Sequence, residues 1–309
     1  DYADWLQGRT ESMEKGLAYW VSQLKDVATN LHLPTDHPRP AQPTYRGERY
    51  PIHIPQALMQ ALETFARSER ASLFSTILAG LQAILFRYTG QKDFCIGSTA
   101  TNRDREDTRF LIGLFVNNLV FRSKLYQGLS FRALLRQTHQ TVVEGLSHQE
   151  VPFERIVDAL NVDREFNRNP LFQVMFVLRT QESRDEPSSS ALNVEPLETQ
   201  HTHSRFDLSL ELTQAHRDWP DSLNSAVICL NHRPLNDLIT ICMSSSARWF
   251  NLLTILSTHG ITSHPAKGSS SSHGIKLKLN VPTIRFLHFS KQEPESIPNG
   301  PPSGSGTFV

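Results

Sequence analysis

The sequence has no excess of either charge and few cysteines. Lys plus Arg number 31 and Asp plus Glu number 31, so the formal net charge is zero. A neutral chain has no long-range attraction to nucleic acid or to an anionic membrane. The three cysteines include no CxxC pair, which excludes a disulfide framework and a zinc knuckle and favours a reduced, cytoplasmic setting. No run of 18 or more apolar residues occurs, so we expect no transmembrane helix.

Signatures of several enzyme classes are also absent. The sequence has no GxGxxG, P-loop, HExxH or GxSxG motif, so nucleotide-binding, zinc-peptidase and serine-hydrolase interpretations have no support. We expect no metal site and no directly bound cofactor. The N terminus, DYADWLQGRT, is polar, does not resemble a signal peptide and lacks an initiating Met. We therefore expect the chain to begin inside a longer protein or to have been processed.

Helical and extended patterns alternate up to about residue 214. Apolar periodicity predicts helices over 14–24, 55–65, 73–88, 130–146 and 152–160, with Ser130 as an N-cap. Apolar or alternating runs predict strands over 50–54, 94–100, 115–125, 171–178, 193–197 and 206–212. This order predicts an α/β fold in which helices pack on an open, mixed sheet.

The pattern changes after Gln214. From there to Val309 the chain has serine-rich and Pro-Gly-Ser segments, scattered histidines and isolated apolar clusters such as 226–230 and 249–256. It fits either a disordered extension or translated sequence from a shifted frame or intron. We favour the second, because the break is abrupt and a natural linker carries more charge and fewer apolar clusters. We place one domain at 1–213 and leave 214–309 unassigned.

Four segments carry a resemblance to a known family. They are Tyr2-Ala-Asp4, Ile112-Gly-Leu-Phe-Val-Asn-Asn118 with Arg122, His148-Gln-Glu-Val-Pro-Phe-Glu154, and 163–176 with Arg168, Asn169 and Pro170. In this order they resemble the YxDY, IGxFVNT, HQDxPFE and RDxSRNPLFQVMF motifs of condensation domains of nonribosomal peptide synthetases. Residues 1–213 thus resemble the C-terminal portion of such a domain. We find nothing like the family's next strand and final helix after Gln214.

The resemblance implies the C-lobe of a chloramphenicol acetyltransferase-like fold, in which two lobes enclose a tunnel. Such domains join a donor acyl or peptidyl thioester to an acceptor aminoacyl amine. The implied partners are carrier domains and adjacent synthetase domains, and the carriers supply the phosphopantetheine arm. The family's HHxxxDG motif, whose second His positions or deprotonates the amine, is absent from this sequence. We therefore expect the N-lobe to be missing, no catalytic residue in this chain and no activity from the chain alone.

The resemblance also marks ten tunnel or motif residues. They are Asn117, Asn118, Arg122, His148, Pro152, Phe153, Glu154, Arg168, Asn169 and Pro170. An amide at 117 would either hydrogen-bond a pantetheine amide or substrate carbonyl in the tunnel, or merely end a strand. The family usually has Thr at 118, so the role of Asn118 stays open. We expect His148 to Glu154 and Arg168 to Pro170 to be structural, and Arg122 to pair with a carboxylate.

Some alternatives remain. His203 and Asp207 have the HxxxD spacing, but Leu208 replaces the glycine, so we interpret the segment as a strand. His201 and His203 have the spacing of a chelating pair, but a solvated loop is the simpler interpretation. Two other functions stay open: a non-catalytic module that docks a carrier or neighbouring domain, and a relative that epimerises, heterocyclises or forms esters.

Overall fold

The structure is a computed structural model. It describes residues 5, 8–35, 39–103, 105–108, 111–162, 165, 167–180, 203–214 and 225–231, all within one compact unit, Asp1–Ala266. The helices of this part of the chain are α2 (Thr10–Leu24), α3 (Gln56–Ser68), α4 (Leu73–Thr89), α5 (Phe131–Ser147) and α6 (Phe153–Ala159). A short 3-10 turn, η1 (Glu106–Thr108), precedes β3.

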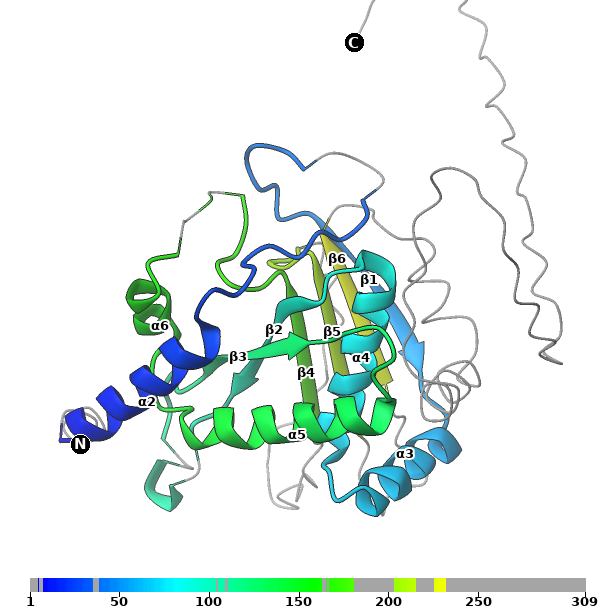
Figure 1. Cartoon of the computed structure of the whole chain (residues 1–309), viewed down its shortest axis with the longest axis horizontal. Coiled ribbons are helices and arrows are strands. Elements are labelled where there is room, and N and C mark those ends of the chain that lie inside the picture. The colour runs from blue at the N-terminus through cyan, green and yellow to red at the C-terminus, as the bar shows by residue number, and fades with distance from the viewer. Residues whose placement is uncertain are drawn as a thin grey trace, which may run out of the picture. The chain divides into compact units, whose positions relative to one another are not determined.

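The strands form one mixed sheet (Figure 1). They are β1 (Gly47–His53), β2 (Asp93–Ala100), β3 (Asn117–Lys124), β4 (Val174–Thr180), β5 (Leu208–Gln214) and β6 (Ser225–Asn231). Their order across the sheet is β1-β6-β5-β4-β2-β3. β4 runs parallel to β5 and β2, while the β1–β6, β5–β6 and β2–β3 pairs are antiparallel. The expected α/β architecture with an open, mixed sheet is therefore confirmed.

Strand β6 corrects the expectation that nothing like another strand follows Gln214. Its residues pair with β5 from Leu208↔Leu230 to Thr213↔Ser225. They also pair with β1 from Gly47↔Asn231 to His53↔Ser225. The expectation was wrong because the cluster 226–230, interpreted as an isolated apolar cluster, forms this strand with two partners that are distant in sequence. The rest of the unassigned segment, 215–224 and 232–309, lies outside the described residues.

Helix α4 forms the centre of the core. Every residue from Ser75 to Phe86 is buried, as the nearly continuous apolar composition of this segment predicts. The Ser72 side chain caps the helix by accepting a 3.0 Å hydrogen bond from the Ser75 N–H. Gly90 ends it with φ 69°, a conformation that glycine adopts without strain, and its N–H donates to the Phe86 carbonyl at 2.8 Å.

The helices pack on the sheet through aromatic side chains. Phe74 of α4 lies with its ring centroid 5.8 Å from that of Phe121 on β3 and 4.9 Å from that of Phe176 on β4. Helix α5 begins at the predicted cap, where Ser130 Oγ accepts a 3.2 Å hydrogen bond from the Ala133 N–H. Figure 1 shows α4 running roughly along β4 and β5 and α5 running crosswise to them. The strand expected over 193–197 lies outside the described residues.

Candidate functional site

The side chain of Asn117 binds three backbone groups of a segment that follows more than thirty residues later. Its Nδ2 donates to the carbonyls of Gln149 at 2.8 Å and Val151 at 2.7 Å. Its Oδ1 accepts from the Phe153 N–H at 3.1 Å. We call this arrangement the Asn117 clamp. Because an amide has only two N–H donors, the clamp uses both, and this geometry favours a positioning role over donation to a ligand.

Asn118 has a different environment. It is the next residue of β3, so its side chain leaves the opposite face of the strand. It is half-buried, and its side chain makes no hydrogen bond within the described part of the chain. Of the two adjacent amides, Asn118 is therefore the one whose donors these residues leave available to a ligand.

The segment around His148 packs against helix α2. Trp20 Nε1 donates to the His148 carbonyl at 3.0 Å, and the Tyr19 ring lies 4.3 Å from the imidazole centroid. A Cβ at Gly16 would come within 2.6 Å of Val151 Cγ2, so only glycine permits this approach. His148 therefore lies in a packed contact between its segment and α2.

Helix α6 starts within the same motif. Pro152 is its N-cap residue, and the Pro152 carbonyl accepts from the Ile156 N–H at 3.3 Å. Phe153 packs on Phe172, with ring centroids 5.6 Å apart. Glu154 is exposed in the first helical turn, where a negative charge interacts favourably with the helix dipole. Pro152, Phe153 and Glu154 thus form the start of α6.

The expected carboxylate partner of Arg122 is Asp93. Arg122 Nε and Nη2 reach the two Asp93 oxygens at 2.8 and 2.6 Å, and these hydrogen bonds raise the pKa of the guanidinium. Arg122 Nη1 also donates to the carbonyls of Gln23 at 2.9 Å and Lys25 at 2.8 Å. Arg122 thereby joins the β2–β3 hairpin to the end of α2. Directly opposite on β2 lies Cys95, whose complete burial raises the pKa of its thiol.

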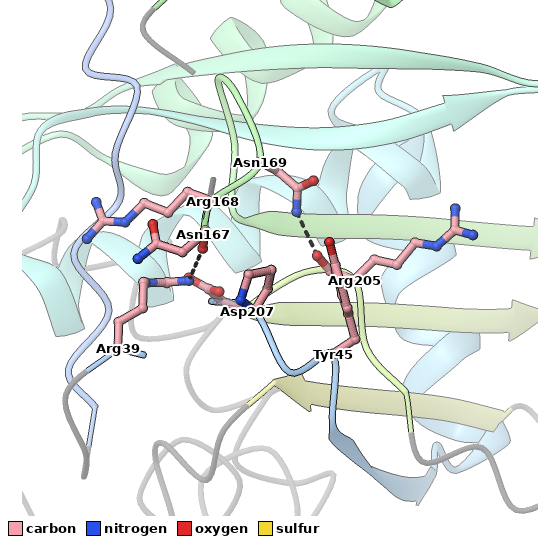
Figure 2. Close-up of a pocket in the computed structure, with 8 residues that line it drawn as sticks. Arg39, Tyr45, Asn167, Arg168, Asn169, Arg205 and Asp207 are labelled. Carbon is pink, nitrogen blue, oxygen red and sulfur yellow. Dashed lines mark hydrogen bonds and ion pairs between the residues drawn. The ribbon is translucent and has the colours of Figure 1, made fainter. Parts of the chain in front are cut away.

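The fourth motif, which holds Arg168, Asn169 and Pro170, contributes Arg168 and Asn169 to the lining of a small cleft of about 50 Å³ at the start of β4 and β5 (Figure 2). The lining residues are Arg39, Pro43, Tyr45, Asn167, Arg168, Asn169, Arg205 and Asp207. Asn169 Nδ2 donates to the Arg205 carbonyl at 2.6 Å, and the Pro170 carbonyl accepts from the Phe172 N–H at 2.8 Å. The turn therefore leads into the core strand as expected.

Arg39 and Asp207 form an ion pair across this cleft. Arg39 also donates to the Asn167 carbonyl at 3.1 Å. Figure 2 shows Arg39 directed toward Asp207, while the guanidinium groups of Arg168 and Arg205 point away from each other. The three cations therefore do not converge on one ligand. Arg168 instead lies 3.4 Å from the Glu165 carboxylate.

Gln173 is a residue that sequence reasoning missed. It is 2% exposed, and its Nε2 donates to the carbonyls of Asn169 and Thr29, each at 3.0 Å. Its Oε1 accepts from the Leu31 N–H at 2.7 Å. A glutamine inside the apolar run LFQVMFV was the available signal, since a buried amide requires partners.

An aromatic row connects the motif segments. Phe172 lies between Phe153, at 5.6 Å, and Phe206, at 5.5 Å between ring centroids. Gly97 of β2 makes room for this row, because a Cβ there would lie 2.1 Å from Phe172 Cε2. The helix α6 start, the turn before β4 and the turn before β5 thus share one packed core.

The histidine alternatives do not form a site in the described residues. His203 is exposed and forms an isolated bridge with Arg46, while Asp207 pairs with Arg39. His201 lies outside the described residues. A serine–histidine contact does occur between Ser75 Oγ and His139 Nδ1 at 3.1 Å, but Ser75 is fully buried and inaccessible to a substrate. No cluster of three or more His, Cys, Asp or Glu side chains that suits a metal occurs in this part of the chain either.

The helices of the described residues also bear on membrane insertion. None of them alone is both long and apolar enough to cross a bilayer. Helices α3 and α4 satisfy these criteria only as a pair, and the chain bends by 101° between them.

The comparisons with known proteins agree with the motifs. A family model described as condensation domain matches residues 1–223. One of the proteins that make up linear gramicidin synthase in Brevibacillus parabrevis is 40% identical over 216 residues, which are 68% of this chain and 3% of that protein. The chain thus spans a small fraction of the length of this relative.

Two solved structures share the fold. The X-domain from teicoplanin biosynthesis matches with a TM-score of 0.71 at 23% identity, covering 84% of this chain and 60% of that one. The condensation domain from the monacolin K polyketide synthase MokA matches with a TM-score of 0.66 at 21% identity, covering 84% and 61%. With this fold and the family match over 1–223, the chain belongs to the condensation-domain family of nonribosomal peptide synthetases.

Proposed function

We propose that this chain provides the C-lobe of a condensation domain that forms amide bonds. In this reaction the amine of a carrier-bound aminoacyl acceptor attacks the carbonyl carbon of a carrier-bound donor thioester. The C–S bond breaks, the donor carrier's thiol leaves with a proton, and the new amide stays on the acceptor carrier. The observation that carries the proposal is the Asn117 clamp, because it joins two family motifs into one unit.

In this proposal the chain's own residues hold β3 in place and bind the pantetheine arm of a carrier. The Asn117 clamp fixes the start of β3, and Arg122 fixes its far end through Asp93. Asn118 lies on the opposite face of β3, and no described residue occupies its donors. It is the residue we assign to hydrogen bonding with a carrier's pantetheine arm. The arm belongs to the carriers, and no step needs a cofactor bound to this chain.

Proton transfer requires a residue from outside this sequence. The family's HHxxxDG motif does not occur here, so the chain alone is expected to form no amide. We propose carrier domains and neighbouring synthetase domains as its partners. A role restricted to docking is less well supported, because a relative from Streptomyces viridochromogenes that is 39% identical is named as a tripeptide synthetase.

The test uses a fused chain, in which a segment of a relative is joined to this chain. The segment that precedes the matched residues in the linear gramicidin synthase relative, if it carries HHxxxDG, is joined ahead of Asp1. Carrier domains loaded with a panel of donor thioesters and aminoacyl acceptors are added, and mass spectrometry follows the amide. Amide from the fused chain, and none from the chain alone or from a fused chain with the second motif His replaced by Ala, supports the proposal. A folded fused chain that forms no amide above that His→Ala control contradicts it.

A further inference from the structure

Strand β5 lies inside the sheet, between β4 and β6, yet one of its faces is polar (Figure 1). Leu210 and Leu212 are buried on one face, whereas Glu211 and Thr213 leave the opposite face and are half-buried. Glu is depleted in strands, and a carboxylate in a dry layer requires a partner. Glu211 therefore indicates that this face of the sheet meets water or a ligand.

The strand register places Glu211 on the same face of the sheet as Asn118. Directly opposed pairs lead from β3 through β2 and β4 to β5: Asn118↔Thr99, Gly97↔Met175 and Val177↔Glu211. Residues opposite each other, and residues two apart in one strand, share a face. Neighbouring strands lie about 4.8 Å apart, so the three steps from Asn118 to Glu211 span about 14 Å.

This face is covered at one level of the strands and accessible at the next. Phe172 covers Gly97, since a Cβ on that glycine would lie 2.1 Å from the Phe172 ring. Two residues further along β2, Thr99 is exposed, and Asn118 and Val177 are half-buried. We call the following side chains the open face: Thr99, Asn118, Val177, Arg179 and Glu211. The open face thus begins where the aromatic row ends, and it presents an amide, a hydroxyl, an apolar group and two charges.

The two charges of the open face form a loose pair. Arg179 Nη2 lies 3.5 Å from Glu211 Oε2, and the Arg179 side chain is 66% exposed while that of Glu211 is 33% exposed. Such pairs contribute little to stability, because water screens the charges and both side chains lose freedom on pairing. The Glu211 carboxylate can therefore exchange Arg179 for another cation or N–H donor at little cost.

We propose that Glu211 binds an amine of the amino acid that a carrier's arm brings against Asn118. This inference rests on the proposed function, in which Asn118 hydrogen-bonds the pantetheine arm. The pantoyl, β-alanyl and cysteamine units of the arm, together with one aminoacyl unit, make four residue-length units. An extended chain covers about 3.5 Å per unit, which matches the span of about 14 Å between Asn118 and Glu211.

Two amines have the required chemistry: the α-amine of an acceptor and the side-chain amine of a basic amino acid. A carboxylate accepts hydrogen bonds from the N–H groups of either one. For an acceptor's neutral α-amine this leaves the nitrogen lone pair free, so binding to Glu211 is compatible with attack on a donor thioester. The experiment separates the two sources.

The experiment uses the whole chain and stable analogues of aminoacyl-pantetheine in which an amide replaces the thioester. The norleucyl analogue carries only an α-amine, the N-acetyl-lysyl analogue only a side-chain amine, and the N-acetyl-norleucyl analogue neither. Isothermal titration calorimetry measures the Kd of each. At least one amine-bearing analogue is expected to bind about tenfold more tightly than the N-acetyl-norleucyl analogue, and the one that does identifies the amine.

Variants test the assignment to Glu211. Glu211→Gln keeps the size of the side chain and is expected to abolish the preference for an amine. Arg179→Gln removes the competing cation and is expected to tighten binding of the preferred analogue about threefold, without changing the N-acetyl-norleucyl Kd. Asn118→Ala should weaken all three analogues alike, because each carries the arm. Glu14→Gln, at an exposed glutamate of α2, is the matched control and should change none of the three.

Several results would overturn the proposal. Equal binding of the three analogues does so, as does the absence of binding by all of them. An amine preference that survives Glu211→Gln also does so, because another group then binds the amine. The fused chain described above separates this inference from the proposed function. Amide formation without an amine preference refutes this inference alone, whereas a preference that depends on Glu211 without amide formation refutes the proposed function alone.

Discussion

Asn117 and Phe153 are joined by a hydrogen bond in which the Asn117 side-chain oxygen accepts from the backbone N–H of Phe153 at 3.1 Å. The same amide satisfies two backbone carbonyls. Asn117→Ala leaves these partly buried groups without their partner, which costs about 1–3 kcal/mol of unfolding free energy. Urea unfolding of the chain measures the loss.

Asn118→Ala is the matched control for that substitution. Its side chain makes no hydrogen bond within the described residues, so we expect a change of less than about 0.5 kcal/mol. Equal losses for the two variants would mean that the clamp adds no stability beyond general packing at the start of β3.

Arg122 should not tolerate lysine. The side chain is 9% exposed, it forms a two-point contact with Asp93, and it donates to two carbonyls at the end of α2. An ammonium group cannot reproduce that planar arrangement of donors. Arg122→Lys is expected to lower the unfolding free energy by about 2 kcal/mol.

A double-mutant cycle with Asp93→Asn checks the cause. The second substitution should add less to Arg122→Lys than it costs in the native background, because the contact is already broken. Strictly additive losses would show that the Arg122–Asp93 contact contributes no coupling energy.

Gly97 is predicted to accept no side chain. The Phe172 ring that a Cβ would meet is 1% exposed and lies between Phe153 and Phe206, so it has no room to move. Gly97→Ala is expected to cost about 1–3 kcal/mol through overpacking, measured by thermal or urea unfolding. In a Phe172→Leu background the same substitution should cost less, and an unchanged cost would locate the clash elsewhere.

Tyr19 is expected to make stability depend on pH in the alkaline range. Burial, and secondarily the negative charge of Glu144, raise the pKa of its hydroxyl from 10.0 to about 12. The unfolded chain therefore loses this proton first as the pH rises. The Tyr19 contribution is fully present below pH 10 and is lost as the pH passes through 12.

The measurement compares urea midpoints of the native chain and Tyr19→Phe from pH 8 upward. The Tyr19 hydroxyl is buried without a hydrogen-bond partner among the described residues, so its removal should not destabilise the chain at neutral pH. The variant should lose less stability than the native chain above pH 10. If the urea midpoints of the two proteins fall equally with pH, the pKa of Tyr19 is the same in the folded and the unfolded chain.

Much of the architecture was predictable because its signals are local. The continuous apolar composition of α4, the Ser130 cap and the glycine that ends α4 each act within a few residues. Strand β6 was missed because its two partners, β1 and β5, are remote in sequence. The motif order predicted the family but not the geometry between motifs.

In the candidate site, too, the type of interaction could be predicted from the sequence, whereas the partner depended on the fold. That Arg122 would find a carboxylate followed from its charge, but Asp93 became its partner only through the antiparallel register of β2 and β3. The two N–H groups of Asn117 could have served a ligand or the backbone equally well. Only the folded position of 149–153 decides between them.

The position of β1 bears on how the chain assembles during translation. Its described neighbour in the sheet is β6, which the ribosome makes only after β2, β3, β4 and β5. β1 therefore emerges early and waits for its hydrogen-bond partner through most of the synthesis of this lobe, with its backbone groups facing solvent or a chaperone. Such distant pairing slows folding. The pairing of β1 with β6 also sets the shortest fragment that can form this sheet. A chain cut at residue 223, where the family match ends, would lack β6 and leave both β1 and β5 with an unpaired edge.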